Sequence, residues 1–146
     1  MRDAGAEVIL AARSKDKLEA LAAEIGARAL ELDVESSESI QRAAAEAGEV
    51  DILVNVAGTN IRKKFEDYTR EQYDKILQTN VHGLVELTQA VGKGMIARGR
   101  GGKIINIGSL TTLHGLPWVS VYALSKGAVG NSPRRWLPNG RDTTSK

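Results

Sequence analysis

Residues 103–126 read KIINIGSLTTLHGLPWVSVYALSK, and this stretch decides the fold that the sequence predicts. It begins with Ile104, Ile105 and Ile107, an apolar run that is typical of a strand buried on both faces of a parallel sheet. A glycine ends the run, so Ser109 is expected at the carboxyl end of that strand. Open α/β sheets bind their ligands at this end of their strands.

The end of the same stretch places a phenol and an ammonium four residues apart, at Tyr122 and Lys126. If the segment is helical, both side chains lie on one face. An ammonium one turn away favours the phenolate form of a tyrosine, which can then exchange a proton with substrate. The Ser109 hydroxyl can hydrogen-bond the same substrate oxygen. The three groups therefore predict proton transfer at a carbonyl oxygen while hydride arrives at its carbon.

The rest of the chain alternates between strand and helix patterns. Strands are expected at 8–12, 28–32 and 50–56, and helices at 15–25, 37–47 and 69–97. This alternation is typical of a parallel sheet with right-handed crossovers. We therefore expect an α/β fold, a Rossmann-type doubly wound parallel sheet, within residues 1–130.

Size and composition are those of one globular domain, with 146 residues, 42% hydrophobic and 26% charged. No apolar run is long enough to span a bilayer, and the start of the chain lacks the pattern of a secretion signal. The absence of cysteine excludes disulfides and fits a reducing compartment. We expect a cytoplasmic protein with no membrane partner.

The net charge of +2 comes from the C-terminal end of the chain. Residues 131–146 hold four basic residues and one acidic residue, a balance of +3, which leaves −1 for residues 1–130. A domain without excess positive charge is not expected to bind nucleic acid. His82 and His114 have no second histidine or acidic partner at ligand spacing, so no metal site is expected.

The order and spacing of Ser109, Tyr122 and Lys126 resemble those of the short-chain dehydrogenase/reductase family, and the resemblance extends from residue 4 to about residue 130. It implies that Tyr122 is the catalytic acid/base and that Lys126 promotes its ionisation and binds the nicotinamide ribose. Ser109 would position the carbonyl. The family also has an asparagine at the position of Asn80, whose carbonyl holds a water in a proton relay, so Asn80 joins the other three as a catalytic tetrad.

The resemblance also implies a site for a nicotinamide cofactor. Ala12 stands where NAD-preferring members usually have an aspartate, and the next residue, Arg13, can accommodate the 2′-phosphate of NADP. We therefore expect NADP(H) to be preferred over NAD(H). Asp33 and Val34 match the family pair that lies against the adenine ring, although an aspartate at this position also initiates turns.

A second cofactor-binding segment is expected at the end of the strand at 50–56. Asn55, Ala57 and Gly58 belong to the sequence Asn-Val-Ala-Gly, which resembles the family's Asn-Asn-Ala-Gly. The small residues let the backbone approach the cofactor ribose, and Asn55 steadies the end of the sheet. Val56 replaces the second asparagine, which removes one hydrogen bond.

The segment from Asn60 to Lys63 resembles that of gluconate 5-dehydrogenase-like and tropinone reductase-like members. Arg62 or Lys63 could hold a sugar-acid carboxylate, and ordinary solvated charges are the alternative. A small polar or sugar-acid-like alcohol or ketone is the expected substrate. Reduction of a 3-ketoacyl group on a carrier protein shares the tetrad and stays open. The resemblance further implies a homodimer or homotetramer, formed through the helix at 80–97 and the helix after it.

Two parts of the family pattern are not found in the sequence. These are the first strand with its glycine-rich, pyrophosphate-binding turn, and the last strands. Residues 131–146 contain two prolines, but a one-base shift of their reading frame gives a helical pattern that resembles the family's continuation. We expect an N-terminally truncated chain, frameshifted after about residue 130, with a disordered, non-homologous tail at 131–146. A non-catalytic remnant or interaction module is the alternative function.

Overall fold

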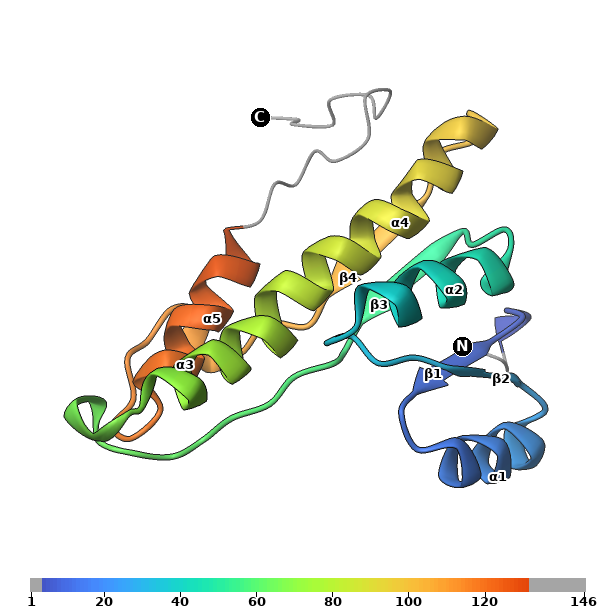
Figure 1. The fold of residues 1–146 in the computed structure, drawn as a ribbon. Coiled ribbons are helices and arrows are strands. Elements are labelled where there is room, and N and C mark those ends of the chain that lie inside the picture. The colour runs from blue at the N-terminus through green and yellow to red at the C-terminus, as the bar shows by residue number, and fades with distance from the viewer. Residues whose placement is uncertain (1–3, 132–146) are drawn as a thin grey trace.

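The structure is a computed structural model that describes residues 4–131 (Figure 1). Its strands are β1 (Ile9–Ala12), β2 (Arg28–Glu31), β3 (Ile52–Asn55) and β4 (Lys103–Asn106). Its helices are α1 (Lys15–Ile25), α2 (Ser37–Ala47), α3 (Arg70–Leu77), α4 (Gly83–Arg98) and α5 (Ser120–Gly130). The predicted alternation of strand and helix is confirmed. The predicted tail, apart from its first residue, lies outside the described residues.

The strands form two separate parallel pairs. β1 pairs with β2, with Ile9 beside Arg28, and β3 pairs with β4, with Ile52 beside Lys103. Within residues 4–131 no strand joins β1 to β3. In the usual order 3-2-1-4-5-6 of doubly wound sheets, strands 2 and 3 are neighbours, and so are strands 4 and 5. The four strands fit positions 2 to 5 of that order, and no described residue occupies the central position 1.

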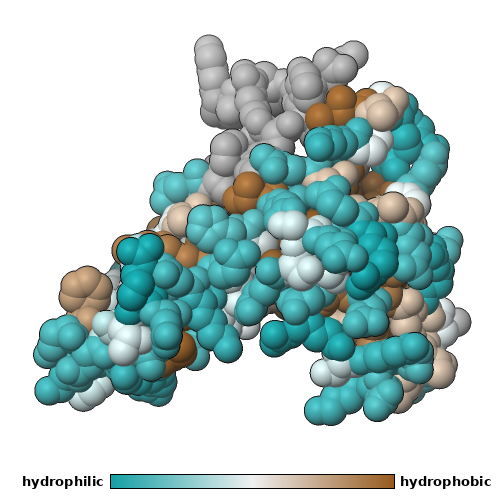
Figure 2. All heavy atoms as spheres, viewed as in Figure 1, coloured by the Kyte–Doolittle hydropathy of each residue, from teal (hydrophilic) through white to brown (hydrophobic). Residues whose placement is uncertain are grey.

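The buried core lies between β2, α2 and α4. Its centre consists of Leu30, Leu32, Val34, Ile40 and Ala43. In Figure 1, α2 and α4 lie side by side in front of β3 and β4, and α1 lies below β1 and β2. Hydrophilic side chains dominate the face of the molecule seen in Figure 2. α1 and α2 thus both pack on the β1–β2 pair, and α4 packs on β3.

One prediction about burial is wrong: the strand at 103–107 is not buried on both faces. Ile105 is 44% exposed and Ile107 is 43% exposed. On the neighbouring strand, Ile52 is 48% exposed, while Asn55 points the other way and bonds Thr88 of α4. The α4 side of this pair is covered, whereas the described residues leave the opposite side largely open. β1 likewise exposes its last two alanines.

The helix ends follow local signals closely. Gly26, with φ 62°, ends α1 in the left-handed conformation that glycine adopts without strain. Ser36 caps α2 by accepting a hydrogen bond from the Ser39 amide. Ser14 occupies the N-cap position of α1, but its side chain makes no capping bond. The ends of α1 and α2 match the predicted ends.

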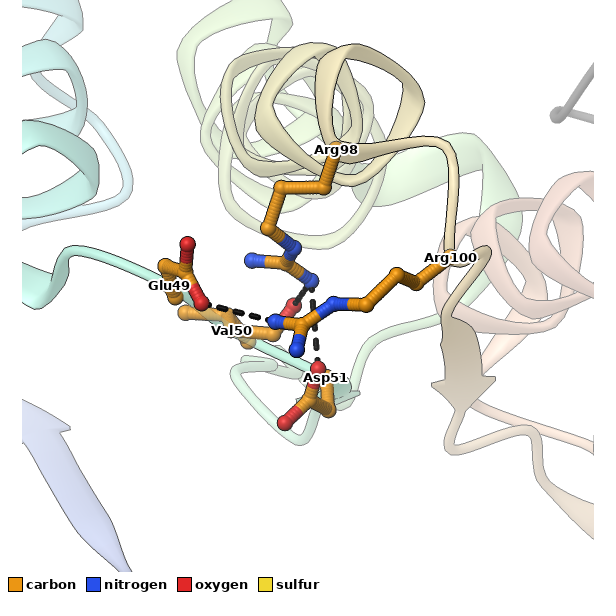
Figure 3. A network of polar contacts seen from close by, with 5 residues as sticks. All are labelled: Glu49, Val50, Asp51, Arg98 and Arg100. Carbon is orange, nitrogen blue, oxygen red and sulfur yellow. Dashed lines mark hydrogen bonds and ion pairs between the residues drawn. The ribbon is translucent and has the colours of Figure 1, made fainter.

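Two arginines fasten the end of α4 to the start of β3 (Figure 3). Arg98 Nη2 donates to Val50 O at 2.6 Å and contacts Asp51 Oδ1 at 3.3 Å. Arg100 Nη2 pairs with Glu49 Oε2 at 2.7 Å, and both of these side chains are exposed. Exposed ion pairs contribute little to stability. The hydrogen bond from the mostly buried Arg98 to Val50 O therefore contributes more to holding the end of α4 against the start of β3.

Candidate active site

An open pocket of about 390 Å³ lies at the carboxyl ends of β3 and β4. It is lined by Val56, Gly58, Thr59 and Asn60 after β3, by Ile107 and Gly108 after β4, and by Tyr122 and Lys126 of α5. This is the end of the strands at which open parallel sheets bind ligands. Three segments that are distant in the sequence thus meet at one pocket.

Tyr122 and Lys126 share one face of α5, as their spacing predicts. Lys126 Nζ lies 5.8 Å from the centroid of the Tyr122 ring. The lysine is only 5% exposed, and its ammonium donates to Ile107 O at 2.6 Å. An ammonium has three N–H donors, so two remain for a ligand in the pocket. The pair provides a phenol beside a fixed positive charge.

Ser109 follows β4 as predicted but is not among the residues that line the pocket. It is the N-cap of a short 3₁₀ helix (Leu110–Thr112), where its Oγ accepts from Thr111 N at 3.2 Å and Thr111 Oγ1 at 2.9 Å. Both bonds use the serine oxygen as acceptor, so its hydrogen remains a donor for a substrate oxygen. The structure thus brings Tyr122 and Lys126 together at the pocket. The Ser109 side chain is held by the turn that it caps.

Asn80 lies in a π-helical turn (Gln78–His82) that interrupts the predicted long helix between α3 and α4. Such turns occur frequently at functional sites. Asn80 is 1% exposed, and its Oδ1 accepts from Thr59 N at 2.7 Å. Its Nδ2 donates to Thr59 O and to Ser125 Oγ, each at 2.9 Å. Asn80 therefore ties the segment after β3 to α5, which are two walls of the pocket.

Gly58 lies close to the side chains of Asn80 and Lys126. A Cβ at Gly58 would stand 3.5 Å from Asn80 Oδ1 and 3.8 Å from Lys126 Nζ. Of the other residues predicted near it, Ala57 is exposed and is not a lining residue. Asn55 is buried, and its Nδ2 bonds Thr88 Oγ1 at 3.0 Å and Asn106 Oδ1 at 2.8 Å. Asn55 thus braces the end of the strand pair, as expected.

The remaining predicted cofactor residues lie on the other strand pair, outside the pocket. Arg13 is exposed directly after β1. Asp33 Oδ1 accepts from Glu35 N at 2.9 Å, which is the turn-forming role that the sequence left open. Val34 is a core residue whose backbone packs against Gly83 at the start of α4. The pair Asp33–Val34 thus has a structural role in the described part of the chain.

Sequence reasoning missed three groups that shape the pocket: the Thr59 backbone, the Ser125 hydroxyl and the Ile107 carbonyl. Thr59 and Ser125 hold Asn80, and the carbonyl of Ile107 holds the Lys126 ammonium. Backbone groups carry no residue signature, and a serine within a helix is common, so no local pattern identifies them. Within residues 4–131, no three histidine, cysteine, aspartate or glutamate side chains gather where they could hold a metal ion.

Trp118 connects the loop before α5 to the segment after β3. With φ 69°, it is the one non-glycine residue in the described range that has a positive φ. Its carbonyl accepts from Lys63 N at 2.9 Å, and the Lys64 ammonium stands 5.9 Å from the ring centroid. A bulky residue in this conformation is uncommon and costs about 1–2 kcal/mol. The contacts with Lys63 and Lys64 hold the two loops that flank the pocket.

Trp118→Gly and Trp118→Ala separate the backbone of Trp118 from its side chain. Both lose the indole contact with Lys64, but only glycine adopts positive φ without strain. After allowing for the greater freedom of an unfolded glycine, we expect the alanine variant to be about 0.5–1 kcal/mol less stable. Urea unfolding of both proteins measures the difference. A more stable alanine variant would mean that the left-handed backbone is not what the fold requires here.

The model of the short chain dehydrogenase family matches residues 1–134. The chain therefore belongs to the short chain dehydrogenase family. No helix within residues 4–131 has the length and apolarity needed to cross a membrane.

Named relatives include oxidoreductases that act on sugars and sugar-like compounds, as their names state. Sorbitol dehydrogenase of Cereibacter sphaeroides is 44% identical over 131 residues, which cover 86% of this chain and 51% of that protein. L-xylulose reductase of Mesocricetus auratus is 33% identical over 130 residues, which cover 88% and 53%. The chain spans about half the length of the curated relatives it matches.

Solved structures share the fold at comparable identity. A gluconate 5-dehydrogenase from Burkholderia cenocepacia, in complex with NADP and tartrate, superimposes with a TM-score of 0.82 at 33% identity. The match covers 87% of this chain and 54% of that structure. The predicted Rossmann-type doubly wound fold is therefore confirmed, and the chain covers part of it.

Proposed function

We propose that the chain forms part of an NADP-preferring oxidoreductase that interconverts an alcohol and a ketone on a small polar or sugar-acid-like substrate. The observation that carries the proposal is the pocket in which Tyr122 and Lys126 meet at the carboxyl ends of β3 and β4. The names of the relatives, with sorbitol, L-xylulose and gluconate among them, support a polar, hydroxylated substrate.

The residues of the pocket fit the ribose and nicotinamide end of such a cofactor. Lys126 is buried and has N–H donors to spare for ribose hydroxyls, and Gly58 leaves the neighbouring wall without a side chain. NADP(H) supplies or accepts the hydride when it is bound. Arg13, Asp33, Val34, Asn55 and Ala57 are proposed to support the rest of the cofactor.

Each catalytic side chain has a distinct proposed role. The Tyr122 hydroxyl passes a proton to the carbonyl oxygen during reduction and takes it back during oxidation. The Lys126 ammonium, fixed by the Ile107 carbonyl and 5.8 Å from the centroid of the Tyr122 ring, donates hydrogen bonds to the nicotinamide ribose. Ser109 donates a hydrogen bond to the same oxygen. Asn80 positions the segment after β3 against α5 through Thr59 and Ser125.

Two basic residues beside the pocket, Arg62 and Lys63, support a sugar acid as the substrate. Arg62 and Lys63 directly follow the pocket-lining segment that ends near Asn60. The Lys63 ammonium already donates to Asp67 O at 3.3 Å, whereas Arg62 is exposed. Arg62 is therefore the better candidate for a bidentate contact with a carboxylate.

Arg62→Gln tests the substrate class. We expect the parent protein to oxidise NADPH faster with a keto-sugar acid than with the matching neutral keto-sugar. The variant should raise KM for the acid about tenfold and leave kcat and the neutral sugar unchanged, since it removes one charge-assisted contact. Absorbance of NADPH measures both rates. Equal losses for the acid and the neutral sugar would contradict the assignment.

Arg13→Asp tests the cofactor preference. The parent is expected to bind NADPH at least tenfold more tightly than NADH, because an arginine at this strand end pairs with the 2′-phosphate. An aspartate there should repel the phosphate and reverse the preference. Fluorescence titrations with both nucleotides measure it. An unchanged ratio of the two dissociation constants would remove Arg13 from the site.

The remaining features of the proposal concern the whole chain. Residues 1–130 are taken as a partial dinucleotide-binding domain, and a homodimer or homotetramer in the cytoplasm is proposed by analogy with the family. A non-catalytic interaction module is the competing function, favoured by the division of the sheet into two pairs. Failure to bind either nucleotide would favour that reading.

A further inference from the structure

The hydroxyl of Thr112 lies between the turn that holds Ser109 and the helix that carries Lys126. Its Oγ1 accepts a hydrogen bond from Ser109 N at 3.1 Å and donates one to Lys126 O at 3.2 Å. The first bond belongs to the local cap of the 3₁₀ helix, whereas the second reaches a residue 14 positions further along the chain. Thr112 therefore joins two parts of the candidate site that are distant in the sequence.

The two bonds require a group that both accepts and donates. A backbone N–H always donates and a backbone C=O always accepts, so the group between Ser109 N and Lys126 O must accept from one and donate to the other. The hydroxyl of threonine does both, whereas the side chain of valine, which has the same shape, does neither. The identity of residue 112 thus decides whether the link exists.

The methyl group of Thr112 also packs tightly against α5. A Cβ at Gly130 would stand 2.2 Å from Thr112 Cγ2, a distance at which one of the two atoms must move. A Cβ at Gly108 would stand 3.3 Å from Thr112 Oγ1. Because threonine is stiff about χ1, a rotation that moved the methyl group away would also carry the hydroxyl away from Ser109 N and Lys126 O. The two glycines therefore leave the room that this side-chain position needs.

Lys126 is held by the segment after β4 at both of its ends. Its ammonium donates to Ile107 O, and its carbonyl accepts from Thr112. Ser109 lies between these two attachments in the sequence. The bonds therefore set how far the Ser109 hydroxyl stands from Tyr122, which α5 also carries.

We propose that Thr112 is a positioning residue, which sets the place of the Ser109 hydroxyl relative to Tyr122 by tying the serine turn to the backbone of α5. Thr112 is not among the residues that line the pocket, so it acts through Ser109. This role rests on the proposed function, since the spacing matters to turnover only if both hydroxyls act on one substrate oxygen. A displacement of about 1 Å in such a site can lower the rate about a hundredfold.

Thr112→Val tests the role, because valine keeps the shape of the side chain and removes both bonds. With NADPH and a keto-sugar acid, kcat should fall by about tenfold to a hundredfold. KM should stay within about twofold, because the bond from Ser109 strengthens mainly as charge develops on the substrate oxygen. Thr112→Ser keeps the hydroxyl and should recover most of kcat. Steady-state oxidation of NADPH measures all three proteins.

Thr69→Val controls for the loss of a local cap. Thr69 is the N-cap of α3, and its Oγ1 accepts from Gln72 N at 3.3 Å, as Thr112 Oγ1 accepts from Ser109 N. It does not line the pocket. The control variant should lose stability, as helices without their caps do, and keep the kcat of the parent. A Thr112 that served only as a cap would behave in the same way.

A second measurement does not require turnover. In Thr112→Val, the Ser109 amide should exchange its hydrogen at least about tenfold faster than in the parent, because this N–H has lost its acceptor. NMR follows the exchange of single amides. Gly130→Ala should have the same effects on exchange and on kcat by displacing the Thr112 side chain. Gly127→Ala should have neither, since nothing stands within 4 Å of a Cβ at Gly127.

Lower kcat in Thr112→Val and Gly130→Ala, recovery in Thr112→Ser and faster exchange at Ser109 would together support the role. It would be overturned, with the proposed function left intact, if an active parent kept its kcat in the folded Thr112→Val variant. Equal losses of kcat in Thr112→Val and Thr69→Val, or a loss without faster exchange at Ser109, would also overturn it. A parent that neither binds nor oxidises NADPH would overturn the proposed function and this role with it.

Discussion

Replacing Tyr122 by phenylalanine is expected to lower the rate of carbonyl reduction by about 10²–10⁴-fold, the range typical of a lost general acid. The substitution removes the hydroxyl and keeps the ring, which faces Lys126 across 5.8 Å in the pocket. NADPH should therefore bind the variant as it binds the parent protein. Steady-state oxidation of NADPH with a keto-sugar acid, together with a binding titration, separates the two effects.

Tyr73→Phe is the matched control for this prediction. Tyr73 is a half-buried tyrosine of α3 that does not line the pocket, so the loss of its hydroxyl should leave turnover unchanged. If Tyr122→Phe kept turnover within about threefold of the parent, Tyr122 would not be the proton donor. A parallel loss in both variants would instead indicate damage to the fold.

Alanine at Gly83 is expected to destabilise the protein by about 3 kcal/mol or more, the upper range for overpacking. A Cβ at this position would stand 2.2 Å from the Val34 carbonyl oxygen and 2.9 Å from Val34 Cβ. The backbone of Val34 cannot yield easily, because its side chain belongs to the core between β2, α2 and α4. Urea unfolding followed by circular dichroism measures the change.

Gly94→Ala provides the control on the same helix. Gly94 is exposed, and nothing stands within 4 Å of a Cβ placed there. Because alanine is the better helix former, this variant should gain about 0.5–1 kcal/mol of stability. If Gly83→Ala were as stable as the parent, the close approach of α4 to Val34 would be wrong.

Local signals predicted the elements well because their causes are local. The ends of α1 and α2 follow from Gly26 and from the Ser36 cap, which act within a few residues of the chain. The π-helical turn at Asn80 has no such cause. It accompanies bonds to Thr59 and Ser125, which lie 21 and 45 residues away in the sequence.

Burial was harder to predict because it depends on what covers each face. The isoleucines of β4 have the composition of a strand covered on both sides, but the described helices cover the side that faces Thr88. The same limit applies to the division of the sheet. Residue patterns identify four parallel strands, whereas their separation into two pairs within residues 4–131 depends on their order in space.

The candidate site was predictable where chemistry required a fixed spacing. Tyr122 and Lys126 follow from helical geometry and meet at the pocket. Ser109 was placed correctly in the chain, but its side chain bonds Thr111, which spacing alone does not reveal. For Asp33 the sequence allowed two roles, contact with the adenine ring and formation of a turn. In the structure its carboxylate accepts the hydrogen bond of the turn.

The central claim is that Tyr122 and Lys126 form the nicotinamide end of a cofactor site, and titration of NADPH fluorescence tests it most directly. Lys126→Met is the variant of choice because methionine fills a buried position without an ammonium. We predict saturable binding in the micromolar range for the parent chain and at least about tenfold weaker binding for the variant. Absence of saturable binding to the parent, or equal affinity of a folded Lys126→Met variant, would contradict the claim.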